Sequence, residues 1–121
     1  MTNKHMLKRQ YLETKTRAGV YAIRNQITGR ALVAGSTNVQ GTLNRHHFEL
    51  RHGLHRNAKL AQEWALHGET NFLFEVLDMV KPSEDPAFNA VQELEILVSL
   101  WRQEIPCHGE LGYDEARRVA Q

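Results

Sequence analysis

The stretch GVYAIRNQITGRALVAG, residues 19–35, decides the fold that the sequence predicts. Its first part divides into two alternating sets, as side chains do along a β-strand: Val20, Ala22 and Arg24 against Tyr21, Ile23 and Asn25. Residues 31–34 form a second short run of small apolar side chains, and Thr28-Gly29 between the runs is typical of a turn. We therefore expect a hairpin of two strands, with one face toward a core and the other face away from it.

A helix is predicted directly after this hairpin. Residues 36–38 (Ser-Thr-Asn) offer three good N-cap residues for a helix that begins near Val39, and Gly53 closes it. His46 or His47 fills a gap in its apolar stripe, which consists of Val39, Leu43, Leu50 and Leu54.

A second helix and a third strand come next. Asn57 is a suitable N-cap for a helix over residues 58–67, and Gly68 suits the position just after its end. The members of its apolar face are Leu60, Ala61 and Trp64. Residues 71–78 are the clearest strand in the chain because they are rich in aromatic and aliphatic side chains.

The last helix is predicted over residues 88–104, because Pro106 cannot continue it. Its apolar stripe consists of Val91, Leu94, Leu97, Val98, Trp101 and Ile105. Ile96 and Leu100 are apolar on the far side, so this helix is either buried on two sides or half-covered by a partner. A homodimer through this helix is one form that such a partner takes.

The length of 121 residues predicts one domain, which is large enough to bury a core without disulfides. We expect a basic arm or helix over residues 1–17, the folded domain over 18–105 and a polar tail over 106–121. The single cysteine, Cys107, excludes an intrachain disulfide and favours a reducing compartment. No stretch approaches the roughly 18 apolar residues of a membrane span. We therefore expect a soluble, cytoplasmic protein without a membrane partner.

Charge is divided unevenly along the chain. Residues 1–59 hold eleven Lys and Arg against two acids, whereas residues 60–121 hold four basic and twelve acidic residues. A basic half favours a polyanionic partner such as nucleic acid, because each phosphate contact releases counterions. The alternative is two solvated faces of opposite sign that attract each other within the fold.

The order and spacing of these motifs resemble the GIY-YIG nuclease superfamily over about residues 18–105. Gly19-Val20-Tyr21 stands for the first motif, and Val33-Ala34-Gly35 stands for the second, with a valine in place of its tyrosine. Further similarity to homing-endonuclease-type members lies in GSTN (35–38), NRH (44–46), LRHGLHRN (50–57), Leu60, Trp64, Gly68 and the strand over 72–77. The resemblance implies an α/β (α+β) fold, in which helices flank a small three-stranded antiparallel sheet.

The resemblance also implies a site for cutting phosphodiester bonds. In the family a glutamate on the last helix binds the metal, here expected to be Mg²⁺ or Mn²⁺, which polarises the phosphate. The family also has an arginine on the helix after the second motif, whose planar guanidinium group can donate hydrogen bonds to two phosphate oxygens at once. Tyr21 matches the tyrosine of the first motif, and His46 and His55 match histidines that line the cleft.

Two charged positions depart from that pattern. Thr42 stands where the family has the arginine, and Val98 stands where it has the glutamate. Arg45 follows Thr42 by three residues, and Glu95 precedes Val98 by three. Each long side chain therefore lies on the same helix face as the position where the family has its charged residue. One hypothesis has Arg45 clamp the phosphate and Glu95 hold the metal. The alternative has Arg45 paired with Glu49 on a solvated face and Glu95 as a surface acid.

A structural zinc site is a minor alternative. Four histidines lie within ten residues: His46, His47, His52 and His55. However, no cysteine lies near them in the sequence, and no H-E-x-x-H spacing exists.

Three functions are compatible with the sequence. The first is a metal-dependent DNA endonuclease with a rearranged site, and the second is a catalytically inactive nucleic-acid-binding module. The third is a protein-interaction or homodimerisation domain. We expect single- or double-stranded DNA as the partner, bound through Arg17, Arg24, Arg30, Arg51 and Arg56.

Overall fold

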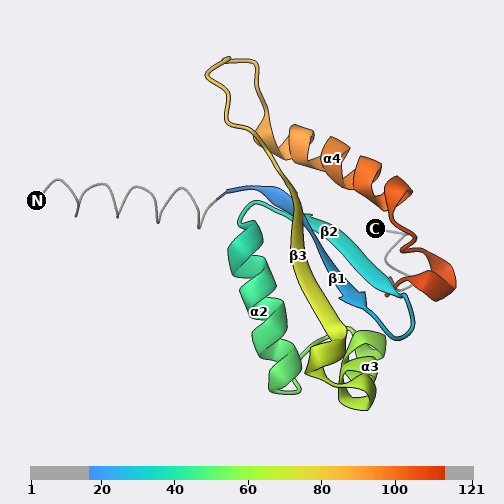
Figure 1. Cartoon of the computed structure of the whole chain (residues 1–121). Coiled ribbons are helices and arrows are strands. Elements are labelled where there is room, and N and C mark those ends of the chain that lie inside the picture. The colour runs from blue at the N-terminus through green and yellow to red at the C-terminus, as the bar shows by residue number, and fades with distance from the viewer. Residues whose placement is uncertain (1–16, 114–121) are drawn as a thin grey trace, which may run out of the picture.

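The computed structural model describes residues 17–113, which form three layers. The middle layer is an antiparallel sheet in the order β2-β1-β3, made of β1 (Gly19–Asn25), β2 (Ala31–Ser36) and β3 (Phe72–Met79). The helices α2 (Val39–Arg51) and α3 (Ala58–His67) cover one face of this sheet, and α4 (Ala90–Glu104) covers the other (Figure 1). The predicted fold class, a small three-stranded antiparallel sheet flanked by helices, is therefore confirmed.

The hairpin of β1 and β2 is buried on both of its faces. Tyr21 and Ile23 point into a core cluster shared with α2 and α3, whereas Val20 and Ala22 point into a second cluster shared with α4. The prediction that one face points away from a core is therefore wrong. Helices cover both faces of the sheet, so both alternating sets of side chains are apolar where the helices cross.

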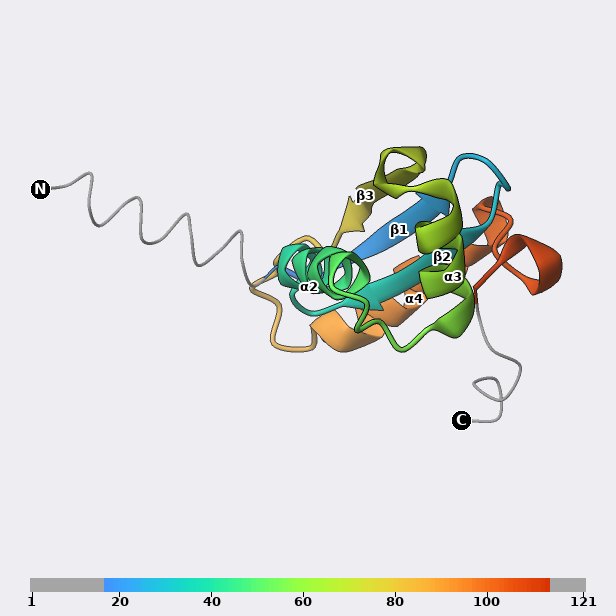
Figure 2. The same cartoon turned by 90° about the horizontal axis from the view of Figure 1, so that it is seen from below.

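The boundaries of α2 and α3 agree with the sequence prediction. Asn38 caps α2 through its side chain, which accepts a hydrogen bond from Gly41 N at 3.1 Å, and Asn57 caps α3 in the same way. Gly68 follows α3 with a φ of 86°, a left-handed conformation that glycine adopts at no steric cost. Leu54, predicted in the apolar stripe of α2, lies beyond the end of that helix and is 63% exposed. Figure 2 shows both helices from their own side of the sheet.

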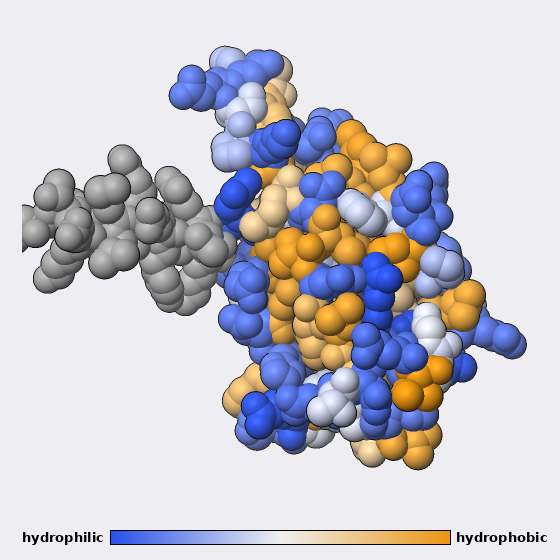
Figure 3. All heavy atoms as spheres, in the orientation of Figure 1, coloured by the Kyte–Doolittle hydropathy of each residue, from blue (hydrophilic) through white to orange (hydrophobic). Residues whose placement is uncertain are grey.

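Helix α4 packs on the sheet through Leu94, Leu97, Val98 and Trp101. Val91, predicted in the same stripe, is 53% exposed, and Phe88 just before the helix packs against the cluster instead. Ile96 and Leu100 are half exposed, as expected for the far side of this helix. In Figure 3 apolar surface is visible along α4 and β3 between polar side chains. No helix within residues 17–113 is both long and apolar enough to cross a membrane.

The segment after α4 belongs to the packed domain up to Tyr113. Cys107 and Tyr113 are almost fully buried, and Gly112 forms a parallel bridge with Ala31 at the start of β2. A side chain at Gly112 would overlap the carbonyl of Cys107, so only glycine fits this close approach. The sequence analysis assigns this segment to a polar tail. Its two buried side chains, Cys107 and Tyr113, are too few to form a periodic pattern that would predict their burial.

Candidate functional site

Three side chains from three different elements form a hydrogen-bonded chain at the surface of the α2 side. The hydroxyl of Tyr21 on β1 lies 2.9 Å from His46 Nε2 on α2, and His46 Nδ1 lies 2.7 Å from His55 Nε2 in the connection to α3. The two imidazole rings stack with centroids 5.0 Å apart. The structure thus brings together the three residues that the family resemblance assigned to one cleft.

One fixed donor sets the direction of every hydrogen bond in this chain. The backbone N–H of Asn57 donates to His55 Nδ1 at 3.1 Å, so that nitrogen carries no proton. Neutral His55 must then carry its proton on Nε2 and donate it to His46 Nδ1. Because His46 Nδ1 accepts this hydrogen bond, neutral His46 carries its proton on Nε2. This Nε2–H donates to the hydroxyl oxygen of Tyr21. His46 therefore acts as a donor toward Tyr21 and cannot remove its proton.

Both histidines are held in the neutral form. Burial, reinforced by the neighbouring His55 and Arg45, lowers the pKa of His46 to about 4. Burial also lowers the pKa of His55; Glu49 opposes this shift and Arg45 adds to it. Neutral rings are what the directed chain requires, because a protonated His55 would place a second N–H against the N–H of Asn57.

The only group of three candidate metal ligands that converge within residues 17–113 is His46, Glu49 and His55, whose ligand atoms all lie within 4.8 Å of one another. Mg²⁺ and Mn²⁺ prefer oxygen ligands, whereas this group offers two imidazole nitrogens and one carboxylate. His55 could bind a metal through Nε2 only if its proton moved to Nδ1, where it would oppose the N–H of Asn57. The donor set around Tyr21 therefore does not fit Mg²⁺ or Mn²⁺. The same hydrogen bond argues against zinc.

The two positions that depart from the family pattern are occupied by other contacts. Thr42 Oγ1 lies 2.6 Å from the Ser36 hydroxyl at the end of β2. Val98 packs against Gly35 so closely that a Cβ on this glycine would lie 2.5 Å from its methyl group. An apolar contact thus occupies the position to which the family resemblance assigned the metal-binding glutamate.

Arg45 and Glu95, the predicted substitutes, lie in different surroundings. Arg45 is exposed on α2 next to His46, and its charge acts on both histidines of the chain. The alternative ion pair with Glu49 is not formed. Glu95 is exposed on α4, which covers the face of the sheet opposite to Tyr21, and it is not part of the converging ligand group among residues 17–113.

The arginines predicted to contact DNA fall into two groups. Three are engaged by acids: Arg24 with Glu75 at 2.7 Å, Arg30 with Glu63, and Arg51 with Glu69 at 3.5 Å. Within the described part of the chain, Arg17 and Arg56 form no ion pair, and Arg56 is exposed immediately after His55.

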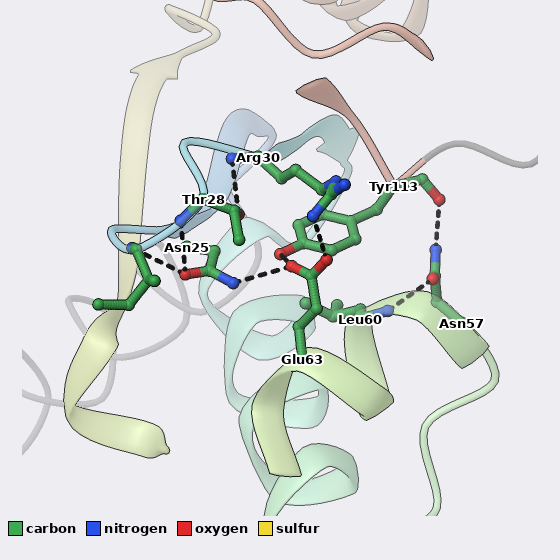
Figure 4. A network of polar contacts seen from close by, with 8 residues as sticks. Asn25, Thr28, Arg30, Asn57, Leu60, Glu63 and Tyr113 are labelled. Atoms are coloured by element: carbon green, nitrogen blue, oxygen red, sulfur yellow. Dashed lines mark hydrogen bonds and ion pairs between the residues drawn. The ribbon is translucent and has the colours of Figure 1, made fainter. Parts of the chain in front are cut away.

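A second polar network, which the sequence prediction missed, lies at the other end of the same side of the sheet (Figure 4). The carboxylate of buried Glu63 accepts hydrogen bonds from Asn25 Nδ2 at 2.8 Å and from the Tyr113 hydroxyl, and it pairs with Arg30. Burial alone would raise the pKa of Glu63, but the hydrogen bonds from Tyr113 and Asn25 and the charge of Arg30 bring it below its usual value. The sequence held one signal: Glu63 falls three residues after Leu60, on the apolar face of α3.

Comparison with known proteins supports the fold. A scan against protein-family models found no match, and a search of curated proteins found none. The catalytic domain of homing endonuclease I-TevI is similar to this chain with 23% identity and a TM-score of 0.61, over 82% of this chain and 98% of that one. A mutant of the catalytic domain of intron endonuclease I-TevI matches with 21% identity and a TM-score of 0.60, over 81% and 92%. The chain therefore has the fold of the GIY-YIG nucleases, as its motifs predicted.

Proposed function

We propose that this domain binds DNA, with the phosphate backbone on the surface formed by Arg45 and Arg56 beside the Tyr21–His46–His55 chain. The observation that supports this most is the position of Arg45, which is exposed, forms no ion pair among residues 17–113 and lies next to His46. A cation without an acid partner can neutralise phosphate at no cost of breaking an existing pair. The two structural neighbours, which are catalytic domains of endonucleases, support the same class of partner.

Salt-dependent binding tests this proposal. Fluorescence anisotropy of a labelled DNA should give an affinity that falls as salt rises, and the slope of log K against log salt should flatten by roughly 1 for each of Arg45→Ala and Arg56→Ala. Lys81→Ala is the matched control, because Lys81 is an exposed cation in the loop after β3. Binding that is undetectable at low salt, or equal losses in all three variants, would contradict the assignment.

Phosphodiester hydrolysis is a second candidate, and the directed Tyr21–His46–His55 chain is the observation that favours it. In this candidate the Tyr21 hydroxyl first releases its proton to solvent, and the hydrogen bond from His46 Nε2 stabilises the phenolate that remains. The phenolate then accepts a proton from an attacking water. In this candidate Arg45 stabilises the negative charge on the phosphate. Because Thr42 and Val98 supply neither a guanidinium nor a carboxylate, we expect cleavage to be slow, and we derive no step through a metal.

A cleavage assay on single- and double-stranded DNA, with Mg²⁺, with Mn²⁺ and with chelator, tests the second candidate. Cleavage that is lost in Tyr21→Phe supports it, and Arg45→Ala and Glu95→Ala show whether either predicted substitute takes part. The double variant Thr42→Arg/Val98→Glu restores both family residues and should cut faster than the natural chain. No cleavage by the natural chain under any of these conditions would leave DNA binding as the function.

Self-association is a further role that the exposed apolar side of α4 supports. Ile96 and Leu100 are half exposed there, so a homodimer would cover them. Light scattering that gives a monomer mass at every concentration would contradict this role.

A further inference from the structure

An aromatic side chain projects from the solvent side of α2, opposite to the buried residues of that helix. Phe48 is 55% exposed, whereas Val39, Leu43 and Leu50 of the same helix are buried. Its ring is stacked on His52, with centroids 4.2 Å apart and planes 25° from parallel. Phe48 and His52 thus form a small aromatic platform, whose outer surface packs against no core cluster among residues 17–113.

Cations surround this platform. Arg45 precedes Phe48 by three residues and Arg51 follows it by three, so both are its neighbours on the helix surface, with roughly 5–6 Å between Cβ atoms. Both arginines are exposed, and Arg51 shares the carboxylate of Glu69 with His47. Glu49, the acid of this helix, acts on His55 at the polar chain. The surface that Phe48 presents is therefore apolar at its centre, and at its edge lies Arg45, a cation that forms no ion pair among residues 17–113.

Flat apolar faces beside phosphates are a property of unpaired nucleotides. In a duplex the faces of the bases are stacked on one another, whereas a single strand exposes them to aromatic side chains. An apolar peptide would fill the centre of the platform but would leave Arg45 without a partner.

We propose that Phe48, supported by His52, stacks on an unpaired base of single-stranded nucleic acid, while Arg45 contacts an adjacent phosphate. The proposal rests on the proposed DNA binding and gives it a substrate class: strands with unpaired bases bind in preference to duplex. Arg45 then connects the platform to His46, so a strand held at Phe48 passes the Tyr21–His46–His55 chain.

Anisotropy with the full chain tests the proposal, using fluorescein-labelled oligo-dT of about 15 nucleotides and a blunt duplex of equal length. We expect oligo-dT to bind more tightly, Phe48→Ala to weaken that binding by roughly tenfold, and Phe48→Trp to retain it. Leu66→Ala is the matched control because Leu66 is another large apolar side chain, 76% exposed on α3. An oligo-U arm shows whether RNA is accepted as well.

The possible outcomes separate this inference from DNA binding itself. If Arg45→Ala and Arg56→Ala weaken binding but Phe48→Ala leaves it within twofold, or if the duplex binds as tightly as oligo-dT, the platform is overturned and DNA binding stands. If none of the nucleic acids binds at low salt, both fail. The Phe48→Trp variant adds a direct readout, because stacking on a base should quench the fluorescence of the new tryptophan, and unchanged emission on saturation would contradict stacking.

Discussion

Two polar networks lie on the same side of the sheet, and they differ in the charge of their buried group. At one end the Glu63 carboxylate is charged, ion-paired with Arg30, and hydrogen-bonded by Asn25 and Tyr113. At the other end His46 is kept neutral and takes part in a chain that ends on Tyr21. The first network joins three separate segments of the chain, whereas the second leads toward an exposed arginine.

We expect from this difference that the Glu63 network stabilises the fold, and the difference supports the proposal that the His46 chain is a functional site. A buried charge whose partners are all in place is costly to disturb, because each partner is left unpaired. The buried, neutral histidines contribute little to the stability of the fold. Burial disfavours their protonated form, and only that form could make ion pairs. Such an arrangement is common where a group must keep one protonation state for binding or chemistry. The predictions below test this division.

The largest effect is expected at Glu63. Glu63→Ala leaves Asn25, Arg30 and Tyr113 without their shared acceptor and should lower the free energy of unfolding by about 3–5 kcal/mol. Urea denaturation followed by circular dichroism measures this loss. Glu69→Ala is the control, since that exposed acid pairs only at the surface and should cost below about 1 kcal/mol. Equal losses in the two variants would contradict a stabilising role for the Glu63 network.

A smaller effect is expected when one donor is removed from the Glu63 network. Tyr113→Phe deletes a hydrogen bond to a charged carboxylate and should cost about 1.5–3 kcal/mol. Tyr21→Phe removes the acceptor of a hydrogen bond from a neutral imidazole and should cost about 1 kcal/mol. The same denaturation experiment measures both variants, and a larger loss for Tyr21→Phe would reverse the proposed division.

The smallest effect concerns acid stability. His46 has a pKa of about 4 in the folded protein and an ordinary value of 6.5, so between these values the unfolded chain binds a proton that the folded chain does not. Stability is therefore complete above pH 6.5 and is lost as the pH falls toward 4. His46→Gln should reduce the loss between pH 7 and pH 5 by about 1 kcal/mol, allowing for solvent screening of the ring. If the stability of the variant and of the natural chain depends on pH in the same way, the contribution of His46 to acid stability is contradicted.

Local sequence signals predicted most of the fold. The caps at Asn38 and Asn57 were predicted because short polar side chains next to an apolar stripe satisfy free backbone N–H groups. The burial of both hairpin faces could not be predicted from the strands, because the position of α4 depends on tertiary packing. Tyr113 was missed for the same reason, since its partners Glu63 and Asn57 lie at least 50 residues away in sequence.

The site was predicted only in part. The family resemblance assigned Tyr21, His46 and His55 to one cleft, and the three side chains are hydrogen-bonded to one another in the structure. Their catalytic role stays a prediction. The sequence pattern could not give the direction of these hydrogen bonds, because that depends on a backbone N–H at Asn57 whose orientation is set by the start of α3. It also could not show that Arg30 is engaged by Glu63, since an ion pair between distant segments leaves no spacing to recognise.

The protonation of the two histidine rings can be measured by long-range ¹H–¹⁵N NMR spectroscopy of the labelled protein at neutral pH. If the hydrogen bonds run from Asn57 through His55 and His46 to Tyr21, both rings are neutral and both carry their proton on Nε2. A proton on Nδ1 of either ring, or a charged His46 at pH 6, would contradict the directed chain and the role assigned to Tyr21.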